Sequence, residues 1–373
     1  MHIYGRTDAV AALEVIDAAD LAPADRAVGP GPHLRHDLLS DDWVAVSPAR
    51  NVRPHANASD PLPALTGSPA ERFGCPLCPG GPELPVDYDA AVFDNRFPSL
   101  TRRPSPVPDP ADPREAPALG ASEVVMYTAR HVGSLATLSP AEMARVVAIW
   151  QDRTAELWAD ERLAYVLPFE NRGIEVGATL AHPHGQLYAF DRLPPSIERR
   201  AAAAAAGRAR LGGCLTCAVV TEELASERIV QRDAHWAIGV PFAPRWPYEV
   251  HLRAVRHGAR RLADLRPAES RALASSLQAV VARYDALFGF ELPYMLVLYD
   301  APRGVEDWHV AAEFYPPHRS GTLTKVRASV ETATGLFIND TLPEESARRL
   351  ASLPVPVPAT HPGFHVLQEP ADG

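Results

Sequence analysis

Three long stretches of this sequence are predicted to be helices, and the first shows apolar residues at a helical period. The first starts at Ser139, where Glu142 completes a capping pattern, and keeps apolar residues three or four apart up to Trp158. The second covers 196–211 and is rich in alanine and arginine, and the third covers 267–288. These patterns predict three helices.

Shorter apolar runs lie between these helices, and their β-branched and aromatic residues predict strands. The predicted strands form a hairpin within 34–47, followed by 123–127, 165–169, strands within 228–240, 294–299 and 307–314. Prolines, 38 in all, gather in 54–69, 104–117 and 354–362, which predicts exposed loops and a tail.

One stretch, Ala181 to Tyr188, holds two histidines and a glutamine at alternate positions. Side chains repeat every second residue in a strand, so His182, His184 and Gln186 would share one face. Because proline has no N–H, the strand must be an edge or leave the position after His182 unpaired. The alternative is a polar loop that happens to hold two histidines.

The residues before this motif suit a ligand that carries phosphate. Glycines such as Gly177 let a backbone approach a ligand closely. Asn171, Arg172 and Thr179 are donors suited to phosphate and ribose oxygens. Together, Glu-Asn-Arg-Gly at 170–173 and His-Pro-His-Gly-Gln at 182–186 resemble the signature of the galactose-1-phosphate uridylyltransferase family, part of the histidine-triad superfamily.

The resemblance implies roles for single residues. His184 is the implied nucleophile toward a nucleotide α-phosphate, and Gln186 the implied partner of the phosphoryl oxygens. An Arg-x-x-Arg-Pro segment implies phosphate contacts from Arg50 and Arg53, with a solvated surface pair as the alternative. Asn95 and Phe97 match the segment of the family that contacts the nucleoside.

The four cysteines form two Cys-x-x-Cys pairs, which in a cytosolic chain are metal sites or redox dithiols. In both halves the order is Cys-x-x-Cys, strand, histidine, helix, strand and a strand bearing histidine, which indicates an internal duplication. The family's Cys₂His₂ zinc site corresponds to Cys75, Cys78, His131 and His182. The duplication then gives a second site of Cys214, Cys217, His257 and His309. The alternative for the second pair is ordinary buried thiols.

These features together predict an α+β chain with a duplicated histidine-triad-like fold, in which each half has an antiparallel sheet and flanking helices. The expected parts are an extension at 1–32, a first repeat at 33–200, a second repeat at 201–330 and a carboxy-terminal segment at 331–373. Superposition of the repeats puts Ala311 in the place of His184 and Glu313 in the place of Gln186. We therefore expect one active site per chain.

The resemblance also bears on metals and assembly. Some family members bind an iron-type metal, but the aligned positions here are Arg200, Tyr299, Ala311 and Glu313, so we expect zinc in two structural sites and no iron. The family is a homodimer in which a carboxy-terminal segment completes the partner's sugar pocket. Lys325, the one lysine of the sequence, and Glu331 fit that segment, and Phe337 takes the place of a sugar-contacting glutamine.

Composition excludes several classes of protein. No run of 18 apolar residues occurs and the first twenty residues lack a basic and apolar signal, so we expect a cytoplasmic chain without a membrane partner. A net charge of −10 argues against a nucleic-acid partner.

The expected partners are a nucleotide sugar and a sugar 1-phosphate. The expected reaction is ping-pong transfer by a UDP-glucose:hexose-1-phosphate uridylyltransferase through a uridylyl-His184 intermediate. One alternative is an ADP-sugar phosphorylase or adenylyltransferase, or a dinucleoside polyphosphate phosphorylase, of the same superfamily. Another is a non-catalytic, zinc-stabilised nucleotide-binding protein.

Overall fold

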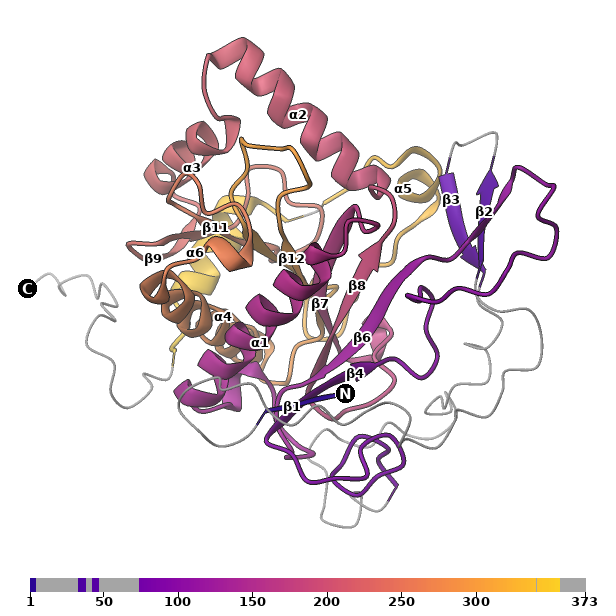
Figure 1. Ribbon diagram of the computed structural model, residues 1–373. Coiled ribbons are helices and arrows are strands. Elements are labelled where there is room, and N and C mark those ends of the chain that lie inside the picture. The colour runs from indigo at the N-terminus through magenta and orange to yellow at the C-terminus, as the bar shows by residue number, and fades with distance from the viewer. Residues whose placement is uncertain (5–32, 38–41, 47–73, 340, 356–373) are drawn as a thin grey trace, which may run out of the picture.

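A ten-stranded antiparallel sheet runs through the part of the chain that the computed structural model describes, residues 1–4, 33–37, 42–46, 74–339 and 341–355 (Figure 1). Its strands in spatial order are β1 (His2–Tyr4), β4 (Ala90–Asp94), β6 (Gly120–Met126), β8 (His184–Phe190), β7 (Tyr165–Arg172), β12 (Tyr294–Tyr299), β13 (Ala311–Tyr315), β11 (Val250–Ala254), β10 (Trp236–Gly239) and β9 (Ile229–Arg232). A smaller sheet joins β3 (Asp42–Val46), β2 (His33–Asp37) and β5 (Glu115–Pro117), which confirms the predicted hairpin.

The order of the strands is symmetric about the middle of the large sheet. From one side the first half contributes β4, β6, β8 and β7, and from the other side the second half contributes β10, β11, β13 and β12. The strands β7 and β12 pair at the centre, with Glu170 opposite Leu296. This symmetry confirms the duplicated α+β fold, with one difference: the two expected sheets are joined into a single one. The residue limits of the repeats stay a prediction.

Three long helices agree with the predicted stretches. They are α1 (Pro140–Ala159), α2 (Pro195–Leu211) and α4 (Pro267–Phe288), joined by the shorter helices α3 (Leu215–Ala225), α5 (Ser329–Thr334) and α6 (Pro343–Ala351) and the 3₁₀ turns η4 (Leu135–Thr137), η5 (Ile174–Val176) and η6 (Leu262–Asp264). The expected cap of α1 is present, because the Ser139 hydroxyl accepts from the Glu142 N–H and the Glu142 carboxylate accepts from the Ser139 N–H. No helix among the described residues is long and apolar enough to cross a membrane.

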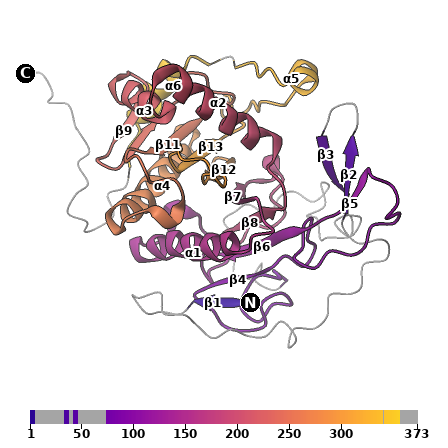
Figure 2. The same ribbon diagram turned by 45° about the horizontal axis from the view of Figure 1, so that its top comes forward.

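The two faces of the sheet have different surroundings. Figures 1 and 2 show α1 and α4 side by side on one face, where Trp150, Tyr284 and Phe314 are fully buried. Strand pairing puts Phe169, Val297 and Glu313 next to one another on the other face. The helices α1 and α4 thus cover one face with the core, whereas on the other face α2 places Arg200 against Glu313 in the second half and the polar residues of the site lie in the first half.

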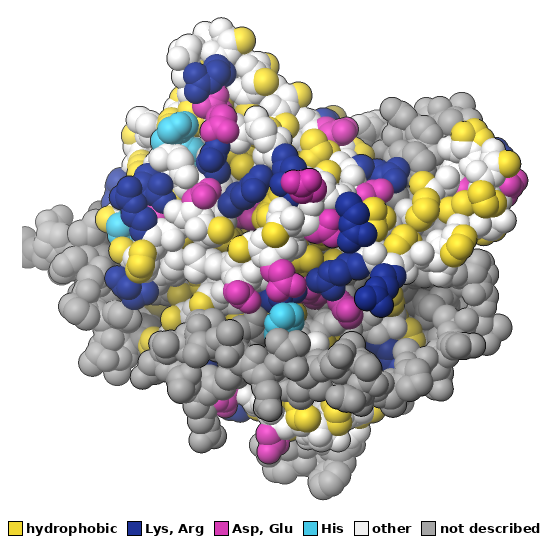
Figure 3. Space-filling view, viewed as in Figure 1, with side chains coloured by type: hydrophobic (Ala, Val, Ile, Leu, Met, Phe, Trp, Pro, Cys, Tyr) yellow, Lys and Arg dark blue, Asp and Glu magenta, His cyan; other side chains and the backbone are white. Residues whose placement is uncertain are grey.

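Charged side chains on the surface are mixed. On the face shown in Figure 3, lysine and arginine side chains lie between aspartate and glutamate side chains and do not gather into one basic patch. This distribution agrees with the net charge of −10 and gives no support to a nucleic-acid partner on that face.

Candidate active site

The strand β8 places the central motif between two neighbouring strands, β6 and β7. His184 and Gln186 are half-exposed on one face of this strand, and Gly185 and Leu187 are buried on the other. The predicted sharing of one face is therefore correct for His184 and Gln186. It is wrong for His182, because the strand begins at His184 and His182 lies before it. Pro183 also precedes the strand, so its missing N–H removes no hydrogen bond between β8 and its neighbours.

Gly185 lets a tyrosine reach beneath the motif. A Cβ atom at this position would lie 2.1 Å from the hydroxyl oxygen of Tyr127 and 3.0 Å from the carbonyl oxygen of Phe169. The first distance is shorter than a Cβ atom tolerates and the second is tighter than most Cβ contacts, so a glycine allows β8 to approach β6 and β7 in this way.

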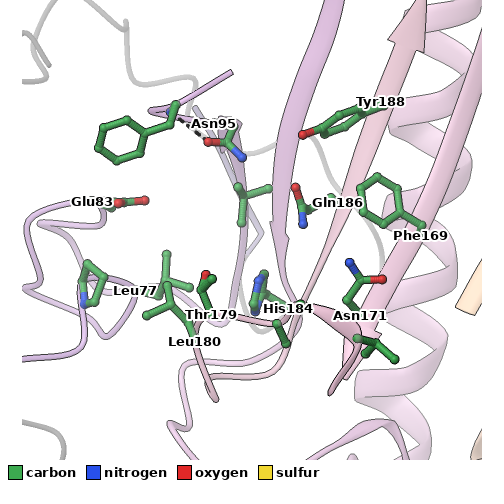
Figure 4. A pocket seen from close by; sticks show the side chains of 16 residues that line it. Leu77, Glu83, Asn95, Phe169, Asn171, Thr179, Leu180, His184, Gln186 and Tyr188 are labelled. Carbon is green, nitrogen blue, oxygen red and sulfur yellow. Dashed lines mark hydrogen bonds between the residues drawn. The ribbon is translucent and has the colours of Figure 1, made fainter. Parts of the chain in front are cut away.

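A cavity of about 320 Å³ lies over this strand, and sixteen residues line it (Figure 4). It brings together seven of the residues singled out from the sequence, namely Asn95, Phe97, Asn171, Gly177, Thr179, His184 and Gln186. Three polar or aromatic lining residues were not singled out: Glu83, Phe169 and Tyr188. Tyr188 continues the alternation of His184 and Gln186, so the pattern of the motif could have identified it.

The described lining of the cavity carries no positive charge. Among the sixteen lining residues there is no lysine or arginine, and Glu83 adds a carboxylate. Arg50 and Arg53 lie outside the described residues. A nucleotide bound here would need cations from segments other than this described lining.

The ring of His184 has a defined tautomer. Its Nδ1 lies 2.7 Å from the backbone carbonyl oxygen of His182, and because a carbonyl only accepts, Nδ1 must carry the proton. The lone pair is then on Nε2. Burial lowers the pKa of His184, with the bond to His182 acting in the opposite direction, so the ring is neutral near pH 7. A neutral imidazole with a lone pair beside a cavity is suited to nucleophilic attack.

The first group of candidate metal ligands comes together as predicted. Cys75, Cys78, His131 and His182 place their ligand atoms within 4.8 Å of one another. The Cys78 sulfur lies 3.4 Å from His131 Nδ1 and 3.6 Å from His182 Nδ1. A tetrahedral zinc with ordinary bond lengths holds sulfur and nitrogen about 3.5 Å apart, so the geometry fits. His182 donates from Nε2 to the carbonyl of Thr128 at 2.8 Å, which turns the Nδ1 lone pair toward the cysteines.

The second group repeats the first. Cys214, Cys217, His257 and His309 also place their ligand atoms within 4.8 Å of one another. The Cys217 sulfur lies 3.4 Å from His257 Nδ1 and 3.2 Å from His309 Nε2. His309 donates from Nδ1 to the carbonyl of Ala254 at 2.6 Å. The equivalent residues His182 and His309 therefore present opposite ring nitrogens, each oriented by a backbone carbonyl, whereas His131 and His257 both present Nδ1.

The structure does not bring Arg172 into the cavity. Its guanidinium is buried and donates to the Asp285 carboxylate at 2.8 Å, with Glu291 3.5 Å away. The alternation along β7 explains this position, because Asn171 faces the cavity and the next residue must face the other way. Asp285 comes from α4, which the local sequence could not reveal.

Lys325 and Glu331 also lie outside the cavity lining of their own chain. The Lys325 ammonium is buried and pairs with the Glu331 carboxylate at 2.7 Å. The hydrogen bond from Lys325 is the largest cause that lowers the pKa of Glu331 to about 2. The two predicted substrate contacts are thus held against each other within one segment.

The equivalent position in the second half is filled by an ion-pair network. Glu313, fully buried, accepts both guanidinium nitrogens of Arg200 at 2.9 and 2.7 Å, and a hydrogen bond from Tyr315. His251 and Arg253 lie 3.6 and 3.5 Å away. In the second half the Arg200 guanidinium therefore binds Glu313, the residue that corresponds to Gln186, and Ala311 takes the place of the histidine.

Comparison with known proteins agrees with this geometry. The models of the galactose-1-phosphate uridyl transferase N-terminal and C-terminal domains match residues 22–194 and 207–362. A galactose-1-phosphate uridylyltransferase from Thermotoga maritima is 40% identical over 330 residues, which cover 87% of this chain and 99% of that protein.

Solved structures give the same result for the fold. A uridylyltransferase structure superposes with a TM-score of 0.74 at 31% identity, over 86% of this chain and 97% of the other. An ADP-glucose phosphorylase from Arabidopsis thaliana, solved with bound ADP-glucose, shares the fold with a TM-score of 0.65 at 22% identity, over 87% and 99% of the two chains. The two family models together span most of the sequence, and the chain belongs to the galactose-1-phosphate uridylyltransferase family.

Proposed function

We propose that this chain is a UDP-glucose:hexose-1-phosphate uridylyltransferase, with galactose 1-phosphate as the first acceptor to consider. The observation that carries the proposal is the Nε2 lone pair of His184, which borders the cavity together with Gln186 in a member of this family. Membership in the family favours a uridine nucleotide over an adenine nucleotide.

The reaction has two matched steps. In the first, His184 Nε2 attacks the α-phosphorus of UDP-glucose, a P–N bond forms, and the P–O bond to glucose 1-phosphate breaks. In the second, a phosphate oxygen of the hexose 1-phosphate attacks the same phosphorus, and the P–N bond breaks to return neutral His184. Gln186 and Asn171 border the cavity beside His184 and supply amide donors to the phosphoryl oxygens (Figure 4).

Zinc is the metal that best fits both groups of cysteines and histidines. Each group offers two sulfurs and two nitrogens, a closed tetrahedral set without a position for substrate. The first zinc would fix His182, whose carbonyl accepts the proton of His184 Nδ1. In the described part of the chain all four cysteines are free of disulfides, which suits a cytoplasmic location.

The assembly proposed for this chain is a homodimer that shares its active sites. The segment from Leu323 to Leu342, called here the carboxy-terminal arm, exposes large apolar side chains. Leu323 is 62% exposed, Val326 73% and Leu336 66%. Apolar side chains gathered in one short segment mark a protein interface. In such a dimer the exposed apolar side chains of the arm pack against a second copy, and Lys325 stays paired with Glu331 unless that contact opens the pair.

The substrate screen that tests this function compares two nucleotide sugars. Purified protein is incubated with UDP-glucose or with ADP-glucose, and release of glucose 1-phosphate is measured with and without galactose 1-phosphate. We expect release from UDP-glucose and formation of UDP-galactose. Release from ADP-glucose alone would support the phosphorylase alternative, and release from neither would support a non-catalytic nucleotide-binding protein.

A further inference from the structure

The cavity holds one carboxylate that the reaction above does not use. Glu83 lies five residues beyond Cys78, and its backbone N–H donates to the carbonyl of Pro76 at 3.1 Å. This bond ties the residue to the loop of the first metal group. In Figure 4 its carboxylate points toward the interior of the cavity, which it lines together with Asn95 and His184.

The carboxylate of Glu83 is half-buried, yet no donor from the described part of the chain bonds to it. Burial raises its pKa, and the nearby Arg96 acts in the opposite direction without an ion pair. The two carboxylate oxygens of Glu83 are therefore available to accept hydrogen bonds from a ligand in the cavity.

The neighbours of Glu83 indicate which part of a nucleotide reaches it. Asn95 is fixed because its Oδ1 accepts from the Phe97 N–H at 2.9 Å, which leaves its amide NH₂ as the donor. Figure 4 shows Glu83 and Asn171 on opposite sides of His184. With the α-phosphate at His184, the side with Asn95 and Phe97 receives the nucleoside.

A nucleoside has two kinds of donor for a carboxylate. Uracil has a single N–H, flanked by two carbonyl oxygens that would repel the carboxylate. Ribose has two neighbouring hydroxyls, which can donate to the two carboxylate oxygens at once, as acidic residues accept from ribose in dinucleotide sites. The ribose is therefore the better partner.

We propose that Glu83 is a specificity-determining residue that accepts hydrogen bonds from the ribose hydroxyls and so selects ribonucleotides over 2′-deoxyribonucleotides. This inference rests on the proposed function, since it places the nucleotide by its phosphate at His184. It assigns to the loop after Cys78 a role in substrate choice in addition to its role in holding the metal.

Binding of UMP and of 2′-deoxy-UMP, measured by calorimetry, tests the role of Glu83 without need of turnover. We expect the wild type to bind UMP roughly tenfold or more tightly than 2′-deoxy-UMP, the scale of one hydrogen bond to a charged group. In Glu83→Ala the two affinities should become nearly equal, through weaker UMP binding. The exposed Glu161→Gln is the control and should keep the wild-type ratio.

Several outcomes would overturn the assignment. Wild-type affinities for both nucleotides in Glu83→Ala would show that another group reads the ribose, and an equal loss for both would show that Glu83 contacts a group that the two nucleotides share and not the 2′-hydroxyl. Glu83→Gln, which keeps the shape of the side chain, covers the case in which the alanine variant does not fold. If neither UMP nor 2′-deoxy-UMP binds the wild type, both this inference and the nucleotide site fail, whereas selective UMP binding without sugar release leaves Glu83 supported and refutes only the transfer reaction.

Discussion

At the scale of single residues, a backbone carbonyl connects the first metal group to the nucleophile. His182 directs its ring to Cys75 and Cys78 and its carbonyl oxygen to His184 Nδ1. The backbone carbonyl of His182 thus decides which nitrogen of His184 holds the lone pair. In the proposed reaction a metal bound by the ring of His182 would act by fixing this carbonyl, without a contact to the phosphate.

Glu313 gives a prediction about stability and pH. Burial raises its pKa, but His251 and Arg200 outweigh burial and hold the pKa well below 4.5. A lowered pKa in the folded state stabilises the fold above pH 4.5, and this contribution is lost as the pH falls below 4.5. Glu313→Gln should therefore lower the free energy of unfolding at pH 7 and make it less dependent on pH below 4.5.

Urea unfolding at pH 7 and at pH 4 measures this effect, with the exposed Glu161→Gln as the matched control. The comparison is made between variants, because acid also weakens cysteine ligation in all of them. A Glu313→Gln protein that loses as much stability in acid as the wild type would contradict the role given to this carboxylate.

The sequence allowed those site residues to be predicted that lie on one strand, and not those whose position depends on partners far away in the chain. His184 and Gln186 belong to one strand, so alternation alone places them together. Arg172 was expected at the substrate, but its partners Asp285 and Glu291 are more than a hundred residues away in sequence. The position of Glu83 in the cavity likewise depends on how its loop packs, which no local pattern encodes.

At the scale of secondary-structure elements, the approach of β8 to its neighbours depends on Gly185. Gly185→Ala should shift the strand away from Tyr127 and Phe169, and with it the ring of His184, so that both activity and stability fall. Gly213→Ala is the matched control, because a Cβ there meets no atom within 4 Å. Transfer rates and thermal unfolding of both variants check this; equal behaviour of the two would contradict the packing argument.

The helices α1 and α4 were predictable, and both begin and end close to the expected residues; for α1 the Ser139 cap also marks the start. The helix α3 was missed because only Val220 in it is buried, so no apolar face marks it. Its amino-terminal cap is Cys214, a residue that the sequence identified only as a possible metal ligand.

At the scale of the whole molecule, duplication predicts the metal content. Wild-type protein should contain two zinc ions per chain, and Cys214→Ser should contain one and keep transfer activity. Cys75→Ser should also contain one but lose activity, because its site orients His184. Elemental analysis with parallel assays distinguishes the two variants, and a wild-type content of one zinc would refute the second site.

The carboxy-terminal arm gives a prediction about assembly. Val326→Asp and Leu336→Asp put a charge on exposed apolar positions and should convert a dimer into monomers with little transfer activity. Leu211→Asp, at an exposed apolar position at the end of α2, is the control and should stay dimeric. Sedimentation velocity gives the state of each protein, and a fully active monomeric wild type would contradict shared active sites.

The nucleophilic role of His184 is the centre of this account, and intact-mass spectrometry after mixing with UDP-glucose, without an acceptor, tests it most directly. We predict a mass increase of one UMP per chain, release of one glucose 1-phosphate, and loss of the added mass when galactose 1-phosphate follows. His184→Gly should bind zinc normally and gain no mass. A wild type that turns over without the covalent nucleotide, or a His184→Gly protein that acquires it, would contradict the account.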